Sequence, residues 1–157
     1  KFAANGKGIR KKDLGLIAMT YGYIYTARVA MGYNDRQTLQ AFLEADAYDG
    51  PSLIIAYTHC IAHGVEMSRG LMQQDLAVQS GMWPLFRYNP AMADEGKNPL
   101  KLDSKAPSIK VEDYAYNEAR FRMLLKTDEE RANMLMEQAN KDVLDRWETY
   151  KHMAGSD

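Results

Sequence analysis

An uninterrupted apolar run, SLIIAY at residues 52–57, is the strongest constraint on how this chain can fold. The turn-forming tripeptide Asp49-Gly50-Pro51 stands before it, and the polar, glycine-terminated loop THCIAHG follows it. A continuous apolar run bounded by turn signals is typical of a strand covered on both faces, as in a parallel sheet. We therefore expect a buried strand over residues 52–57 and a loop at its carboxyl end over residues 58–64.

The segments around this run alternate between strand and helix patterns. Residues 23–29, YIYTARV, and residues 82–88, MWPLFRY, are rich in β-branched or aromatic side chains and are expected to be short strands. Asn34 and Gln37 have the spacing of a capping box at the start of a helix. Apolar residues then follow a helical period through QTLQAFLEADAY.

Two more helices are expected, one before the first strand and one after the loop. Asp13 is an N-cap candidate for a short helix that ends at Gly22, and residues 65–80 are expected to be helical up to Gly81. Strand, helix, strand, helix, strand is the order of βαβ units. The expected fold class is α/β: a partial parallel sheet flanked by helices, whose missing strands come from residues outside this chain.

The last third of the chain has a different character. Residues 89–110 hold three of the five prolines and little periodicity, so they are expected to form an extended arm. Thr127 and Glu130 then have capping-box spacing before a long C-terminal helix. One apolar stripe runs along that helix: Ala132, Leu135, Met136, Ala139, Val143, Trp147 and Tyr150. We divide the chain into an α/β part, residues 1–88, and an arm with C-terminal helices, residues 89–157.

Composition excludes several classes of protein. The net charge of −1 gives no electrostatic case for nucleic acid or an anionic membrane, and no apolar run reaches the roughly 20 residues of a membrane span. The start, KFAANGKGIRKK, has no apolar signal-peptide core, and a single cysteine indicates a reducing compartment, so we expect a cytoplasmic protein. Ten methionines and ten tyrosines favour surfaces that pack against other protein.

The single cysteine, Cys60, lies in the loop between His59 and His63. Loops at the carboxyl ends of parallel strands form the ligand-binding edge of open α/β sheets. Three interpretations remain open from the residues alone. Cys60 is a small buried hydrophobe, a nucleophile with one of the histidines as base, or one ligand of a metal or cluster. An iron–sulfur cluster usually needs four thiolates, so the others would have to lie outside this chain.

Other charged motifs indicate surface rather than chemistry. Asp94-Glu95 and Asp128-Glu129-Glu130 are expected in a polar loop and in the first turn of a helix, where carboxylates complement the helix dipole. The basic run at residues 10–12 is expected to be a solvated loop, with contact to a phosphate-bearing ligand as its alternative. The residues by themselves form no complete active site.

Four stretches of the chain resemble one enzyme family. They are KFAANGK, RKKDLGLIAMTYGYIYTARVAMG, AFLEADAYDGPSLIIAYTHCIAHG and LFRYNPAMADEGKNPLKLDSKAPS. Together they are similar to the C-terminal end of pyruvate:ferredoxin (flavodoxin) oxidoreductase, in order and with similar spacing from residue 1 to about 150. The resemblance implies that the chain is the C-terminal portion of a thiamine-diphosphate-binding domain in a long, multidomain, homodimeric enzyme.

The resemblance also implies a role for Cys60. It aligns with the family's cysteine that completes the [4Fe–4S] cluster nearest the thiamine, whose other ligands lie far upstream. His59 and His63 would then shape the surroundings of the cluster without binding it. The family oxidises pyruvate on thiamine diphosphate and Mg²⁺, transfers the acyl group to coenzyme A and passes electrons to ferredoxin or flavodoxin. By the same resemblance, these cofactors bind mainly outside this chain, which alone is expected to be inactive.

Three alternatives to this interpretation stay open. The full protein could act on a different 2-oxoacid. The chain could be a stand-alone α/β interaction module in which Cys60 is merely buried. It could also be a small thiol enzyme that uses Cys60 and a histidine.

Overall fold

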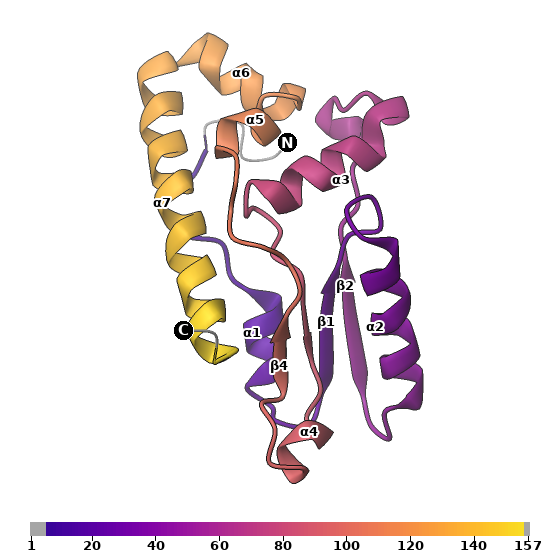
Figure 1. Ribbon diagram of the computed structural model, residues 1–157. Coiled ribbons are helices and arrows are strands. Elements are labelled where there is room, and N and C mark those ends of the chain that lie inside the picture. The colour runs from indigo at the N-terminus through magenta and orange to yellow at the C-terminus, as the bar shows by residue number, and fades with distance from the viewer. Residues whose placement is uncertain (1–5, 156–157) are drawn as a thin grey trace.

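Two neighbouring strands have the predicted parallel pairing. β1 (Tyr25–Val29) and β2 (Ser52–Ala56) run parallel over their whole length. α2 (Asp35–Ala47) connects them and covers one face of the sheet, as Figure 1 shows. The computed structural model, which describes residues 6–155, therefore contains the strand–helix–strand unit expected from the sequence. The first quoted stretch, KFAANGK, lies mostly outside these residues, as do the outer ends of the two-part division.

The other half of the sheet is antiparallel, so the prediction of a wholly parallel sheet is wrong for this chain. β3 (Phe86–Tyr88) pairs antiparallel with β1, and β4 (Leu100–Leu102) pairs antiparallel with β3. The strand order is β2-β1-β3-β4. The expected extended arm thus contributes a strand and a short helix, α4 (Ala91–Asp94). A short connection such as this one can join antiparallel strands, whereas a parallel crossover needs a dozen or more residues.

Two helix starts are capped as the sequence predicts. Asp13 Oδ1 accepts hydrogen bonds from the backbone of Gly15 (3.1 Å) and Leu16 (3.4 Å) at the start of α1 (Leu14–Met19). Asn34 Oδ1 accepts from the Gln37 backbone N–H at 2.9 Å at the start of α2. In both cases a short polar side chain satisfies helix N–H groups that have no partner within the helix.

The long C-terminal helix begins one residue later than its predicted cap. Asp128, not Thr127, is the N-cap of α7 (Glu129–Met153), and its carboxylate accepts from the Arg131 backbone at 3.0 Å. Thr127 instead ends α6 (Ala119–Thr127), where its hydroxyl donates to the Met123 carbonyl at 3.0 Å. The Asp128 backbone is extended, which ends one helix and starts the next.

The loop after β2 and the segment after β4 are mostly helical. The helix expected over residues 65–80 is shorter and is preceded by two 3₁₀ turns. These elements are η1 (Ile61–His63), η2 (Met67–Arg69), α3 (Gly70–Gln79) and α5 (Val111–Ala115). Together with α6 they lie beyond the carboxyl ends of the parallel strands (Figure 1).

The apolar stripe of the C-terminal helix faces the core as predicted. α1 and α7 lie on the face of the sheet opposite α2 (Figure 1). Tyr150 is fully buried, its ring stacks on Phe86 with centroids 4.9 Å apart, and its hydroxyl donates to Asp13 at 2.8 Å. Ala132, Val143 and Trp147 are also buried on this side. This packing joins the two ends of the chain through one core.

A buried charged network ties the outer strands to α2. Arg87 on β3 donates to both carboxylate oxygens of Asp103, at 2.8 and 2.9 Å, and also pairs with Glu44 of α2. Tyr25 donates to Glu44 at 3.0 Å, and Gln37 donates to Asp103 at 3.0 Å. Hydrogen bonding to Asp103 raises the pKa of Arg87 above its ordinary value. Every charge in this network is therefore paired.

Two apolar surfaces are left uncovered within this chain. Leu39, Phe42 and Leu43 of α2 are 60%, 54% and 57% exposed, because the helix packs on the sheet through small residues such as Ala41. Strand β2 is only half-buried, since it is the edge strand and nothing among residues 6–155 pairs with its outer side. The expectation that this strand is covered on both faces is not met by this chain alone.

Candidate functional site

The Cys60 loop stands at the carboxyl end of the parallel strand pair, as predicted. The Tyr57 backbone N–H donates to the Val29 carbonyl at 3.0 Å, which extends the strand pairing by one residue before the loop begins. The Cys60 carbonyl then accepts from the His63 N–H at 3.0 Å and starts the turn η1. The Cys60 thiol is free, and its side chain is half-buried. A ligand held by other parts of a larger protein can therefore reach it.

The two histidines of the loop point to structural surroundings rather than to a thiol–imidazole pair. The His59 ring packs tightly on Gly70, where an added Cβ would lie 2.2 Å from His59 Nε2. His59 Nδ1 is buried and has no hydrogen-bond partner among the described residues. Partial desolvation and the charge of Arg120 lower the pKa of His63. No hydrogen bond joins either imidazole to Cys60 within residues 6–155, so the thiol-enzyme alternative gains no geometric support.

The base of the loop rests on a buried carboxylate. Glu118, which precedes α6, is 1% exposed. Its Oε1 accepts from Gln73 of α3 at 3.0 Å and from the Tyr57 hydroxyl at 3.3 Å, and its other oxygen pairs with Arg120. The Tyr57 and Tyr114 hydroxyls are 3.0 Å apart. Burial raises the pKa of both tyrosines, so both stay protonated and able to donate.

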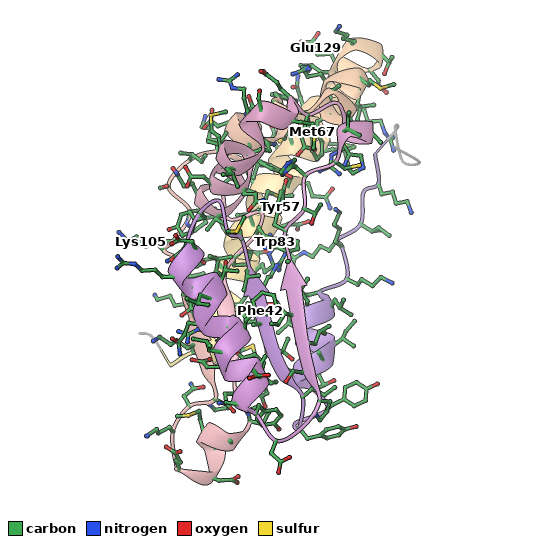
Figure 2. The ribbon with its side chains drawn as sticks, turned by 90° about the vertical axis from the view of Figure 1, so that its right-hand side faces the viewer. Phe42, Tyr57, Met67, Trp83, Lys105 and Glu129 are labelled. Carbon is green, nitrogen blue, oxygen red and sulfur yellow. The ribbon has the colours of Figure 1, made fainter. Side chains whose placement is uncertain are left out.

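An aromatic and cationic layer lies beneath this network. Figure 2 shows Tyr57 and Trp83 near the tips of the parallel strands, and their rings pack edge to face with centroids 5.3 Å apart. The Trp83 indole donates to the Val29 carbonyl at 3.0 Å, and the Arg28 guanidinium lies 3.9 Å from the Trp83 ring centroid. Burial, together with the charge of Arg146, lowers the pKa of Arg28 to about 10. Arg28 therefore stays charged at neutral pH.

The other charged motifs behave largely as surface groups. Asp94 and Glu95 are exposed, and Glu95 pairs with Lys97 at 2.6 Å. The basic run is only partly solvated, because Arg10 forms ion pairs with Asp142 (Nε to Oδ1, 2.8 Å) and with Asp145. These contacts hold residues before α1 against α7.

Metal-binding groups do not cluster within the chain. Among residues 6–155, no set of three or more histidine, cysteine or carboxylate side chains could hold a metal ion. Cys60 can thus supply one soft ligand at most, which agrees with a cluster whose remaining thiolates come from elsewhere. In the same part of the chain, no helix combines the length and apolarity needed to cross a membrane.

Sequence reasoning did not find Glu118. It is separated from Cys60 by 58 residues and belongs to no motif, and nothing in the stretch YAYNEARF distinguishes its side chain from a surface carboxylate. Only the return of α5 and α6 to the carboxyl end of the sheet brings it under the loop.

Comparison with known proteins gives a consistent set of relatives. The chain is 55% identical to a pyruvate-flavodoxin oxidoreductase of Nostoc sp. over 98% of its own length. It is 49% identical to the pyruvate:ferredoxin oxidoreductase of Moorella thermoacetica over 98%, and 43% identical to a probable pyruvate-flavodoxin oxidoreductase of Escherichia coli K12 over 99%. The chain is homologous to one segment of these oxidoreductases. No protein-family model matches it.

The homologous segment is a small part of each relative. The chain spans 13% of the length of these three oxidoreductases. It is thus a fragment relative to them, with most of the homologous enzyme outside it. The open edge of β2 and the uncovered face of α2 agree with a segment that packs against more polypeptide.

Proposed function

We propose that the chain is the C-terminal part of the thiamine-diphosphate-binding domain of a 2-oxoacid oxidoreductase. The full protein oxidatively decarboxylates pyruvate to acetyl-CoA and CO₂ and passes the electrons to flavodoxin or ferredoxin. The observation that carries this proposal is the identity of 43–55% with such enzymes over nearly the whole chain. The partners are the rest of the same polypeptide and a second copy in a homodimer, and the location is cytoplasmic.

Within this enzyme, Cys60 is one ligand of a [4Fe–4S] cluster. A cysteine ligand must be a thiolate, and it must be reachable from the side where the other ligands lie. The half-buried thiol at the open end of the sheet meets the second requirement. The cluster supplies one-electron transfer when bound. Thiamine diphosphate and Mg²⁺ bind mainly to residues outside this chain.

The two-part division has a functional meaning in this proposal. Residues 1–88 form the α/β part that presents Cys60. Residues 89–157 add β4 to the sheet and bring α5, α6 and α7 against it, so this part supports the loop although it contains no cysteine.

The uncovered face of α2 is proposed to pack on the remainder of the polypeptide. The triple substitution Leu39→Gln, Phe42→Gln and Leu43→Gln is expected to reduce self-association of the excised 157-residue chain, because it removes apolar surface exposed only in the fragment. The same substitutions are expected to lower the melting temperature of the full-length protein, since each side chain then loses its contribution of about 1.5–3 kcal/mol from burial.

Light scattering of the excised chain and calorimetry of the full-length protein test this expectation. The triple substitution Gln40→Ala, Glu44→Ala and Asp46→Ala would disturb an ion pair, so the better control is Arg36→Gln, an exposed position on the same helix. If the triple glutamine variant of the full-length protein melts at the unsubstituted temperature, the face of α2 is not an internal contact.

An activity assay tests the proposed function directly. The full-length protein, supplied with thiamine diphosphate, Mg²⁺ and coenzyme A, should reduce flavodoxin or ferredoxin when pyruvate is added. The 157-residue chain should not. A full-length protein that responds to another 2-oxoacid but not to pyruvate would move the substrate, and a full-length protein inert with every 2-oxoacid would contradict the proposal.

A further inference from the structure

The Cys60 loop is attached to the rest of the chain on both of its sides. On the strand side, the Tyr57 hydroxyl donates to Glu118 at 3.3 Å. On the far side, the Gly64 carbonyl accepts from the Ala119 backbone N–H at 3.3 Å. Both attachments converge on two consecutive residues, Glu118 and Ala119, although about 60 residues separate them from the loop in sequence.

The far attachment has no room for a larger residue. Gly64 has φ +70°, a conformation that side chains rarely adopt, and an added Cβ would lie 2.4 Å from the Ala119 Cβ. The loop backbone therefore passes directly over the start of α6. Between the two attachments, the loop has little regular structure other than the single turn of η1.

The Glu118 carboxylate joins three elements beneath the loop. Gln73 approaches it from α3, Tyr57 from the end of β2 and Arg120 from α6. Gln73 also donates to the Tyr114 carbonyl at 3.1 Å, which connects α5 to the same group. A buried carboxylate that accepts from several partners is costly to leave unpaired, so this network favours one arrangement of its elements.

We infer that Glu118 is a positioning residue for Cys60: it fixes the loop that presents the thiolate without touching the ligand itself. This inference rests on the proposed function for its consequence, but its structural content does not. Groups outside the ligand sphere that orient a metal ligand typically affect metal affinity or activity by about 10- to 100-fold when removed. Glu118 would act at one remove in the same way.

Hydrogen exchange of the full-length holoenzyme tests the structural content. In Glu118→Gln, the amide group presents a donor to Gln73 and Arg120, so the support beneath the loop weakens. The amides of His63, Gly64 and Ala119 are expected to exchange about tenfold or more faster, the equivalent of losing one hydrogen bond to a charged group. Glu137→Gln, an exposed position on α7, is the matched control and should leave these amides unchanged.

A milder variant keeps the test decisive if Glu118→Gln does not fold. Tyr57→Phe removes only the hydroxyl and keeps the ring on Trp83, so it should give a smaller acceleration at the same amides. Unchanged exchange in the folded variants would overturn the inference.

The consequence for the ligand is read from the cluster itself. In Glu118→Gln, the electron paramagnetic resonance signal or the potential of one cluster should change, and acceptor reduction should fall about 10- to 100-fold, with no change in Glu137→Gln. Faster exchange with unaltered signal, potential and rate would overturn the positioning role.

Cys60→Ser separates the two proposals. If that variant keeps its full iron content and spectrum, the ligand assignment fails and the positioning of a cluster ligand fails with it, while faster exchange would still show that Glu118 holds the loop. If Cys60→Ser loses one cluster but Glu118→Gln behaves like the unsubstituted protein, only the inference about Glu118 fails.

Discussion

Cys60→Ser in the full-length protein is expected to remove one [4Fe–4S] cluster and reduce pyruvate-dependent reduction of flavodoxin or ferredoxin to background. Cys60 is the only thiol in the chain, and no other set of metal-binding side chains within residues 6–155 could replace it. Iron analysis should show the loss of one cluster, with the remaining clusters still visible by electron paramagnetic resonance. The measurement needs anaerobic purification, because iron–sulfur clusters of this kind are sensitive to oxygen.

The contrast with His63→Ala makes the Cys60 result specific. His63 shares the loop and its turn but is not assigned as a ligand. Its substitution should preserve the iron content, with any effect confined to the potential. Full cluster content and activity in Cys60→Ser would leave the stand-alone interpretation of a merely structural cysteine as the better account.

Arg87→Met is expected to destabilise the outer half of the sheet by about 3–5 kcal/mol. The substitution leaves the carboxylates of Asp103 and Glu44 without their shared cation, and the Asp103 side chain is only 7% exposed. Breaking a buried pair by removing one partner costs far more than an exposed ion pair contributes, because the remaining charge stays buried.

Hydrogen exchange at the amides of β3 and β4 measures this effect in the full-length protein, where a single melting transition is not guaranteed. Arg87→Lys should lie between the two extremes, since it keeps the charge but not the two-pronged contact with Asp103. Arg36→Met, on the exposed side of α2, should change little. Equal protection in Arg87→Met and the unsubstituted protein would show that the network does not stabilise the sheet.

The local elements could be predicted from the sequence because their signals are local. Asp13 and Asn34 cap helices since their side chains reach the backbone two or three residues on, and the β1–α2–β2 unit follows from alternating patterns. The stripe ending at Tyr150 faces the core because a helical period alone defines one face.

The non-local features could not be predicted in the same way. The antiparallel pairing of β3 with β1 depends on where the chain returns, and the segment of β4 is too short and too polar to announce a strand. Leu39, Phe42 and Leu43 follow a core-like pattern but are exposed, because the surface that they suit is absent from this chain. Glu118 gains its role only from the packing of α3, α5 and α6.

The central claim is that the thiolate of Cys60 binds iron together with ligands outside this chain. Anomalous diffraction at the iron absorption edge, on crystals of the anaerobically prepared full-length protein, tests it most directly. The account predicts an iron atom within bonding distance of Cys60 Sγ, at the carboxyl end of β2. A complete set of iron sites with none bonded to Cys60 would contradict it.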